Sequence, residues 1–172
     1  MARGTDRGRQ MVMAVAFAGV GCVAGLPTAN AADGSVRGTD ARAQALVRKA
    51  ENRSPMIAAL IMSLNATDVV VMVQVTLMPA RLGGDMRWLV ATGRYRYLVV
   101  RVHASRSPEE QMELLGHELQ HANEVAAAKE VRDEATLAAL MARIGRRTGE
   151  GTFDTDAAVR VGRQVRAEIT RR

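Results

Sequence analysis

The order of apolar and polar positions divides the chain into helical and extended segments. Between residues 40 and 50, apolar side chains recur every three or four positions, which predicts an amphipathic helix capped by Thr39 or Asp40. Pro55 should end or kink this helix. The very apolar stretch after Pro55 predicts a second, largely buried helix that ends near Asn65.

The pattern then changes to that of β-strands. Residues 69–79 form an unbroken, largely β-branched run, which predicts a strand covered on both faces. Residues 86–103 predict two more strands, joined near Thr92–Gly93. Because helices precede and follow these strands, the sequence predicts an α+β domain with a small, mainly antiparallel sheet of about three strands.

A long helix is predicted directly after the sheet. Ser107 is a suitable cap, Pro108 suits the first helical position, and Glu109 and Glu110 suit the first turn. Two further helices are predicted, one over about 133–144 and one over about 156–169. The sheet is therefore expected to pack against helices, with the longest of them immediately after it.

Two faces of this long helix differ in chemistry. The apolar stripe comprises Leu115, Leu119, Ala122 and Ala126. On the opposite side lie His117, His121 and Glu124, at helical spacing. Two histidines four residues apart can direct their imidazoles at one metal ion, and Glu118, about 100° from His117, can reach a water bound there.

An amphipathic helix with a solvated polar face would carry the same pattern, so the rarity of histidine matters. The chain has 3 histidines in 172 residues. Chance would produce roughly 0.003 occurrences of H-E-x-x-H in such a composition. The pattern therefore favours a metal site over a solvated face.

The motif HELQH, His117–His121, resembles that of the zincin metallopeptidases, and three predicted strands before the helix are similar to their minimal domain. The resemblance implies that His117 and His121 hold zinc and that Glu118 is the base that activates the zinc-bound water. It also implies an antiparallel strand that borders the cleft and holds extended substrate by strand addition. The longer GHELQHAxEV pattern and the later FDT-x-A, Phe153–Ala157, resemble a group of secreted bacterial proteins.

The zincin pattern stops after the second histidine. Asn123 stands where zincins usually have an apolar residue, and the metzincin glycine and third histidine are replaced by Glu124 and Ala127. Glu124 is the first candidate for the third ligand because its side chain leans back toward His121, although it can instead orient His121 without touching the ion. The other candidates are Glu130, Asp133, Glu134, Asp154 and Asp156. His103 is expected to be a strand-end histidine.

The N-terminus has the three parts of a secretory signal peptide. A positively charged start is followed by an apolar run over residues 11–26 and by an A-x-A site, which predicts cleavage after Ala31. Residues 1–31 would be the signal and residues 32–172 a single secreted or periplasmic domain. Lipidation at Cys22, the only cysteine, is the alternative. No later run approaches the length of a transmembrane helix, and without Cys22 the mature chain has no thiol.

Charge and composition add a basic surface but no nucleic-acid signature. The formal net charge is +6, and aromatic residues make up only 3% of the chain. Arginines spread along the chain without interleaved aromatics indicate a solvated surface rather than a nucleic-acid site. The sequence therefore predicts a zinc metallopeptidase that acts on a peptide or protein. Two alternatives stay open: a non-catalytic zincin-like module of the cell envelope, and a basic protein that binds acidic surfaces.

Overall fold

The structure, a computed structural model, describes residues 34–171 except 80, 150 and 151. The predicted signal peptide, its cleavage after Ala31 and the alternative lipidation of Cys22 lie outside the described residues. None of the described helices is both long enough and apolar enough to cross a membrane.

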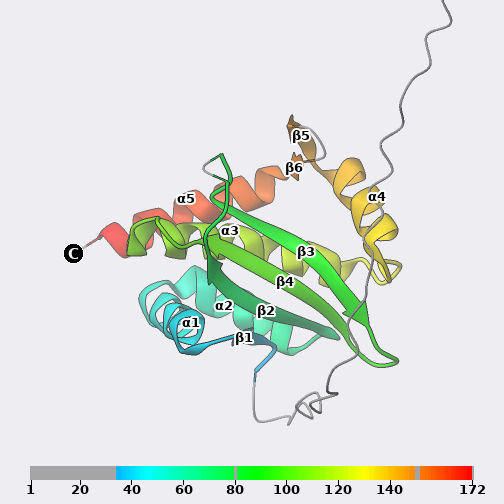
Figure 1. The fold of residues 1–172 in the computed structure, drawn as a ribbon, viewed down its shortest axis with the longest axis horizontal. Coiled ribbons are helices and arrows are strands. Elements are labelled where there is room, and N and C mark those ends of the chain that lie inside the picture. Colours follow the sequence, from blue (N-terminus) through cyan, green and yellow to red (C-terminus); the bar gives the residue numbers. More distant parts are fainter. Residues whose placement is uncertain (1–33, 80, 150–151, 172) are drawn as a thin grey trace, which may run out of the picture. The chain divides into compact units, whose positions relative to one another are not determined.

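Helices and strands alternate in blocks along the described chain (Figure 1). The elements are β1 (Val36–Gly38), α1 (Ala41–Arg53), α2 (Pro55–Asn65), β2 (Val69–Thr76), β3 (Gly84–Ala91), β4 (Arg96–His103), α3 (Pro108–Ala127), α4 (Glu134–Ile144), β5 (Arg146–Gly149), β6 (Thr152–Asp154) and α5 (Asp156–Thr170). Strands β1 to β4 form one sheet in the order β1-β2-β4-β3, and β5 and β6 form a separate antiparallel hairpin. The predicted α+β class, with a long helix after the sheet, is confirmed.

The main sheet differs from the prediction in strand number and direction. Strand β1 adds a fourth strand, and β2 is parallel to both of its neighbours, so only the β3–β4 pair is antiparallel. An apolar pattern reports which strand faces are buried but carries no information on the partner of each strand. The connection after Thr76 passes the position of β4 and places β3 at the edge, which no local pattern encodes.

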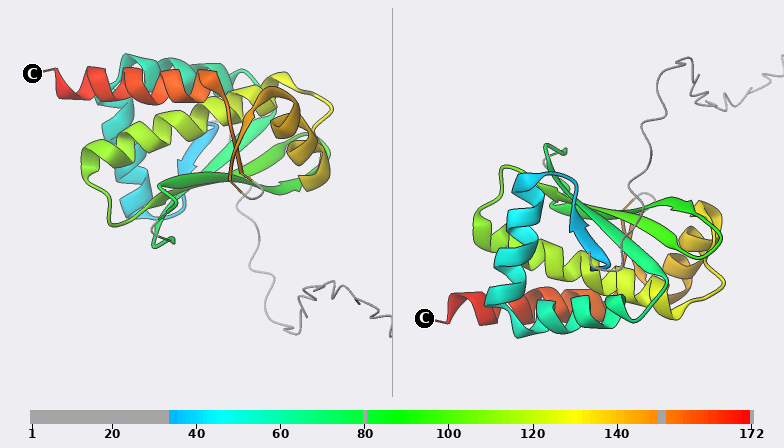
Figure 2. Two further views of the ribbon diagram at one scale, coloured as in Figure 1. Left: turned by 90° about the horizontal axis from the view of Figure 1, so that it is seen from above. Right: turned by 90° about the horizontal axis from the view of Figure 1, so that it is seen from below.

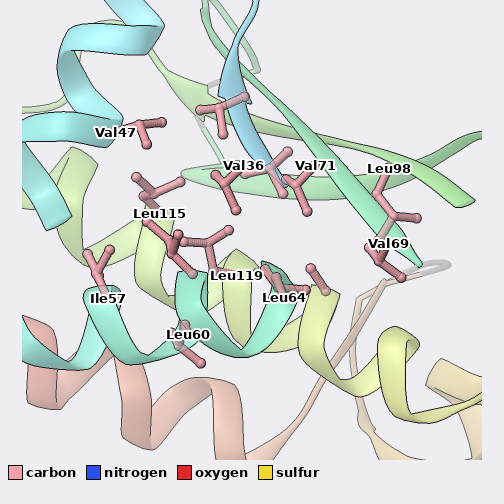
Figure 3. Close-up of a cluster of buried hydrophobic side chains, with 14 of the residues drawn as sticks. Val36, Val47, Ile57, Leu60, Leu64, Val69, Val71, Leu98, Leu115 and Leu119 are labelled. Carbon is pink, nitrogen blue, oxygen red and sulfur yellow. The ribbon is translucent and has the colours of Figure 1, made fainter. Parts of the chain in front are cut away.

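The core lies between the sheet and the helices. Along β4, Leu98, Val100 and Val102 are fully buried, whereas the residues between them are partly exposed. Figure 2 shows α2, α3 and α5 on the same side of the sheet, with α3 between the sheet and α5. Figure 3 shows aliphatic side chains from the strands, such as Val71, meeting those of the helices, such as Leu115. Helix α3 is therefore covered from two sides.

The start of α3 agrees with the sequence prediction. Ser107 and Glu110 form a capping box: the Ser107 hydroxyl accepts from the Glu110 amide at 3.2 Å, and the Glu110 carboxylate accepts from the Ser107 amide at 2.9 Å. Leu115 and Leu119 of the predicted apolar stripe are fully buried. Cap and stripe together determine where α3 begins and which face it turns to the sheet.

The end of α3 is held by Arg96, a residue that the sequence placed on the surface with the other arginines. Arg96 is instead fully buried at the start of β4. Its guanidinium pairs with both carboxylate oxygens of Asp68 and donates to backbone carbonyls at the end of α3 and just beyond it. The last carbonyls of a helix have no amide partners further along the helix, and Arg96 supplies N–H donors to them. The expectation of a solvated arginine is wrong at this position.

Two glycines allow α3 and α5 to approach closely. A Cβ atom on Gly116 of α3 would lie 2.7 Å from Cγ2 of Val165, whose β-branched side chain has little freedom within α5. A Cβ atom on Gly162 of α5 would come no closer than 3.6 Å to His117, which is ordinary van der Waals contact. Only Gly116 is therefore required by the packing.

We expect opposite effects from alanine at these two positions. Gly162→Ala should raise the free energy of unfolding by about 0.5–1 kcal/mol, because alanine loses less backbone freedom in a helix than glycine. Gly116→Ala should lower it by about 1–3 kcal/mol, because the added methyl overpacks the interface. Urea unfolding of the two variants measures both changes, and equal effects would contradict the difference in packing between the two glycines.

Candidate metal centre

Three potential metal ligands converge where α3 meets the β5–β6 hairpin. Asp154, the last residue of β6, has its Oδ1 3.2 Å from Nε2 of His117 and 3.6 Å from Nε2 of His121. The two imidazole rings are 5.0 Å apart between centroids and are inclined at 77°. Ligand atoms of these three residues all lie within 4.8 Å of one another. The group can therefore hold a metal ion.

The Asp154 carboxylate has the surroundings of a metal ligand. Its Oδ1 is buried and has no hydrogen-bond partner among the residues that the structure describes, although two imidazole nitrogens face it. Buried acceptors in proteins are nearly always satisfied. Ligands bound tetrahedrally about 2.0–2.1 Å from an ion are about 3.3–3.4 Å apart, close to the two distances from Asp154 Oδ1 to the histidine nitrogens. The donor set of two nitrogens and one oxygen, partly open to solvent, fits a divalent transition-metal ion.

The Nδ1 atoms of both imidazoles face away from Asp154. Nδ1 of His117 faces α5, where a Cβ atom on Gly162 would lie 3.7 Å away. Nδ1 of His121 lies 2.9 Å from the Glu124 carboxylate. When Nδ1 of each ring carries the proton, both Nε2 atoms present lone pairs toward Asp154. Two lone pairs and a carboxylate oxygen facing one another call for a cation between them.

The charges around the site affect the two histidines differently. Burial lowers the pKa of His117 below its ordinary value, against the charge of Asp154, which favours the protonated ring. Burial acts in the same direction on His121. There the hydrogen bond with Glu124 and the nearby carboxylates outweigh it and raise the pKa of His121. The carboxylates therefore make this centre attractive to positive charge, whether it is a proton or a metal ion.

Glu118 lies beside the group without belonging to it. It is buried, and its carboxylate approaches Gly84 of the edge strand β3, where an added Cβ would lie 3.1 Å from Oε1. Burial raises the pKa of Glu118 to about 7. Enzymes tune glutamates to this range when the side chain must both accept and release a proton near neutral pH.

The solvated polar face that an ordinary amphipathic helix would carry is absent from this part of α3. His121 and Glu118 are both buried, and the side chain of His121 is only 7% exposed. A helix with a wet face would leave both in water. The interpretation as an ordinary amphipathic helix therefore fails, because α5 packs along the side of α3 that faces away from the sheet and Asp154 of β6 lies against the two histidines.

The structure places Glu124 behind His121 and brings Asp154 to the Nε2 atoms of both histidines. Among the described residues, the group that could hold an ion is His117, His121 and Asp154. Glu124 contacts Nδ1 of His121, the ring nitrogen that faces away from Asp154. This corresponds to the orienting role that the sequence left open for Glu124. Asp154, and not Glu124, therefore completes the group that could hold an ion.

The other residues considered from the sequence have different partners. Asp156 pairs with Arg146, Glu130 pairs with Arg143, and Asp133 caps α4. His103 ends β4 and bonds to Ser105, as expected for a strand-end histidine. No role was predicted for Thr155, whose hydroxyl donates to Glu124 at 2.7 Å. Its only signal was its place inside the FDT-x-A segment.

Comparison of the chain with protein-family models, with curated proteins and with solved structures finds no match in any of the three. The resemblance to zincins therefore rests on the HELQH motif, and the chemistry of the centre has to be derived from its own residues.

Proposed function

We propose that the protein is a zinc-dependent metallopeptidase, secreted or periplasmic, in which His117, His121 and Asp154 hold one zinc ion. The observation that carries this proposal is the buried Oδ1 of Asp154, which faces two imidazole nitrogens and has no hydrogen-bond partner in the described part of the chain. Three protein ligands with one open position are typical of catalytic rather than structural zinc sites. Zinc, when bound, polarises a carbonyl group and lowers the pKa of water to about 7.

The residues around the ligands have separate tasks in this proposal. Glu118 accepts the proton of the attacking water at its carboxylate and delivers it to the leaving amine. Its pKa of about 7 suits both transfers, because neither protonation state is strongly preferred near neutral pH. Burial of Glu118 excludes competing water from the carboxylate.

The edge strand β3 is the expected substrate-binding element. It is the last strand of the sheet and runs antiparallel to β4, so its outer edge offers backbone groups to an extended peptide. Gly84 of this strand lies beside Glu118. A peptide that adds to the edge at this point would have its backbone next to the base, which agrees with a peptide or protein substrate.

The test measures zinc and hydrolysis together. The metal-free full chain should bind about one equivalent of zinc, and the loaded protein should cleave an unfolded substrate such as labelled casein. Asp154→Ala should weaken zinc binding by about 100-fold or more, because a ligand is lost. Asp156→Ala, two residues away and paired with exposed Arg146, is the matched control and should bind zinc as the unaltered chain does.

Either of two results would overturn the proposal. A folded, zinc-supplied protein that binds no metal excludes a zinc centre. Full zinc binding without hydrolysis of unfolded protein or peptide mixtures excludes the peptidase and supports a non-catalytic binding module.

A further inference from the structure

The carboxylate of Glu124 connects the two segments that carry the metal ligands. Its Oε2 lies 2.9 Å from Nδ1 of His121 on α3, and its Oε1 accepts from the Thr155 hydroxyl at 2.7 Å. Gln120 contributes a longer contact of 3.4 Å to Oε1. The side chain of Glu124 is 13% exposed and Thr155 is buried, so solvent offers little substitute for these bonds.

Thr155 makes two hydrogen bonds with one hydroxyl group. Its oxygen accepts from the Ala158 amide at 3.1 Å, which caps the N-terminus of α5. The single hydroxyl proton is thereby directed to Glu124. Many helices begin with such a cap. Here the capping residue also donates a hydrogen bond to the Glu124 carboxylate, whose other oxygen is bonded to His121.

The position of Thr155 in the chain gives this bond a second effect. Thr155 directly follows Asp154, the ligand from β6, whereas Glu124 follows His121 on α3 by three residues. The Thr155–Glu124 bond therefore joins α3 to the Asp154 segment close to both ligands. It lies one residue from Asp154 and about one helical turn from His121. A loss of this bond would change both the orientation of one ligand and the position of another.

We infer that Thr155 and Glu124 are a pair of positioning residues for the metal centre. Glu124 holds His121 with its proton on Nδ1, which leaves Nε2 for the ion, and Thr155 fixes that carboxylate and the neighbouring Asp154 against α3. The inference rests on the metal binding of the proposed function but not on hydrolysis. Outer partners of this kind are worth about 10–100-fold in metal affinity.

The test is the zinc affinity of the metal-free full chain, measured by competition with a chelating indicator. Thr155→Val, which keeps the shape and removes the hydroxyl, should weaken zinc binding by about 10–100-fold, and Thr155→Ser should restore it to within about threefold. Glu124→Gln should also weaken it, because His121 and Thr155 bond to different oxygens of Glu124, and glutamine replaces one of these oxygens by an NH₂ group that cannot accept. The absorption bands of the cobalt-substituted protein should change in Thr155→Val and return in Thr155→Ser.

A matched control separates positioning from a lost helix cap. Asp40 caps α1 through the Ala43 amide at 2.8 Å, and its only described side-chain hydrogen bond is this cap. Asp40→Ala should therefore destabilise the fold as loss of a cap does, yet leave zinc affinity and the cobalt spectrum unchanged.

The outcomes distinguish this inference from the proposed function. If the unaltered chain binds zinc and Thr155→Val binds it equally well, the positioning role is wrong and the metal centre stands. If Thr155→Ser fails to restore the affinity, the hydroxyl is not the acting group and the inference is again overturned. If the unaltered chain binds no zinc, both the proposed function and this inference are wrong.

Discussion

Replacement of Glu118 by glutamine is expected to lower hydrolysis by the zinc-loaded protein by about 10²–10⁴-fold, the range that a general base contributes. Glutamine has nearly the same shape, and Glu118 lies outside the group of ligand atoms, so the variant should keep its zinc. Because Glu118 is buried, glutamine also removes the cost of holding a carboxylate out of water. The variant should therefore be at least as stable as the unaltered chain.

The measurement compares hydrolysis rate, zinc content and unfolding free energy in one set of preparations. Glu113→Gln is the matched control, since it makes the same chemical change five residues earlier on α3. Glu113 pairs with Arg166 at 3.1 Å in a partly exposed ion pair, so its loss should leave the rate within about twofold. If Glu118→Gln hydrolyses substrate as fast as this control, Glu118 is not the general base. If Glu118→Gln binds no zinc, Glu118 is a metal ligand.

The sequence was sufficient for those parts of the site that lie within a few turns of one helix. The Ser107–Glu110 capping box determines where α3 starts, and helical geometry alone then places His117 and His121 on one side. Both features depend on interactions between residues that are close in sequence, so the sequence alone is enough to predict them. For the same reason the apolar stripe on α3 was predicted correctly, and with it the side that faces the sheet.

The third ligand was beyond local reasoning because it depends on how a distant segment returns. Asp154 lies on β6, and only the packing of α5 along α3 and the pairing of β6 with β5 bring it to His117 and His121. Glu124 shares the helical face, and its sequence spacing cannot tell a side chain that faces the ion from one that faces Nδ1 of His121. Distinguishing Asp154 from Asp156 likewise required the hairpin, which the sequence did not predict.

Buried charge is the other feature that the composition concealed. The arginines are spread along the chain, and nothing in the local pattern distinguishes Arg96 from exposed Arg94 two residues earlier. What distinguishes them is a set of partners that are far away in sequence: the carboxylate of Asp68 and the backbone carbonyls beyond Glu124. Such a site exists only in the folded chain, so the sequence carries no signal of it.

Replacement of Arg96 by methionine is therefore expected to cost about 3–5 kcal/mol of unfolding free energy, the range for breaking a buried ion pair by removing one partner. The loss leaves Asp68 without its bidentate partner and removes the buried side-chain donor of the Val125 and Ala128 carbonyls, which keep only their backbone amide donors. Arg96→Lys keeps the positive charge but cannot reproduce the planar, two-pronged geometry of the guanidinium. Its free energy of unfolding should therefore lie between those of Arg96→Met and the unaltered chain.

The dependence on pH provides a second measure of the same pair. The hydrogen bond from Arg96 holds the pKa of Asp68 well below its usual range. A carboxyl whose pKa is lowered by folding contributes stability above its unfolded pKa of about 4, and that contribution is lost as the pH falls below it. The difference in stability between the unaltered chain and Arg96→Met should therefore be greatest near neutral pH and should shrink on acidification below about pH 4.

Arg143→Met is the matched control, because it removes an arginine whose ion pair with Glu130 is exposed on both sides. It should change the free energy of unfolding by less than about 1 kcal/mol, and its difference from the unaltered chain should not shrink comparably at low pH. Urea unfolding of Arg96→Met, Arg96→Lys and Arg143→Met at several pH values measures these differences. If Arg96→Met proved no more costly than Arg143→Met, the end of α3 would not depend on this guanidinium. Its anchoring would then have to come from the buried apolar residues Val125 and Val131 instead.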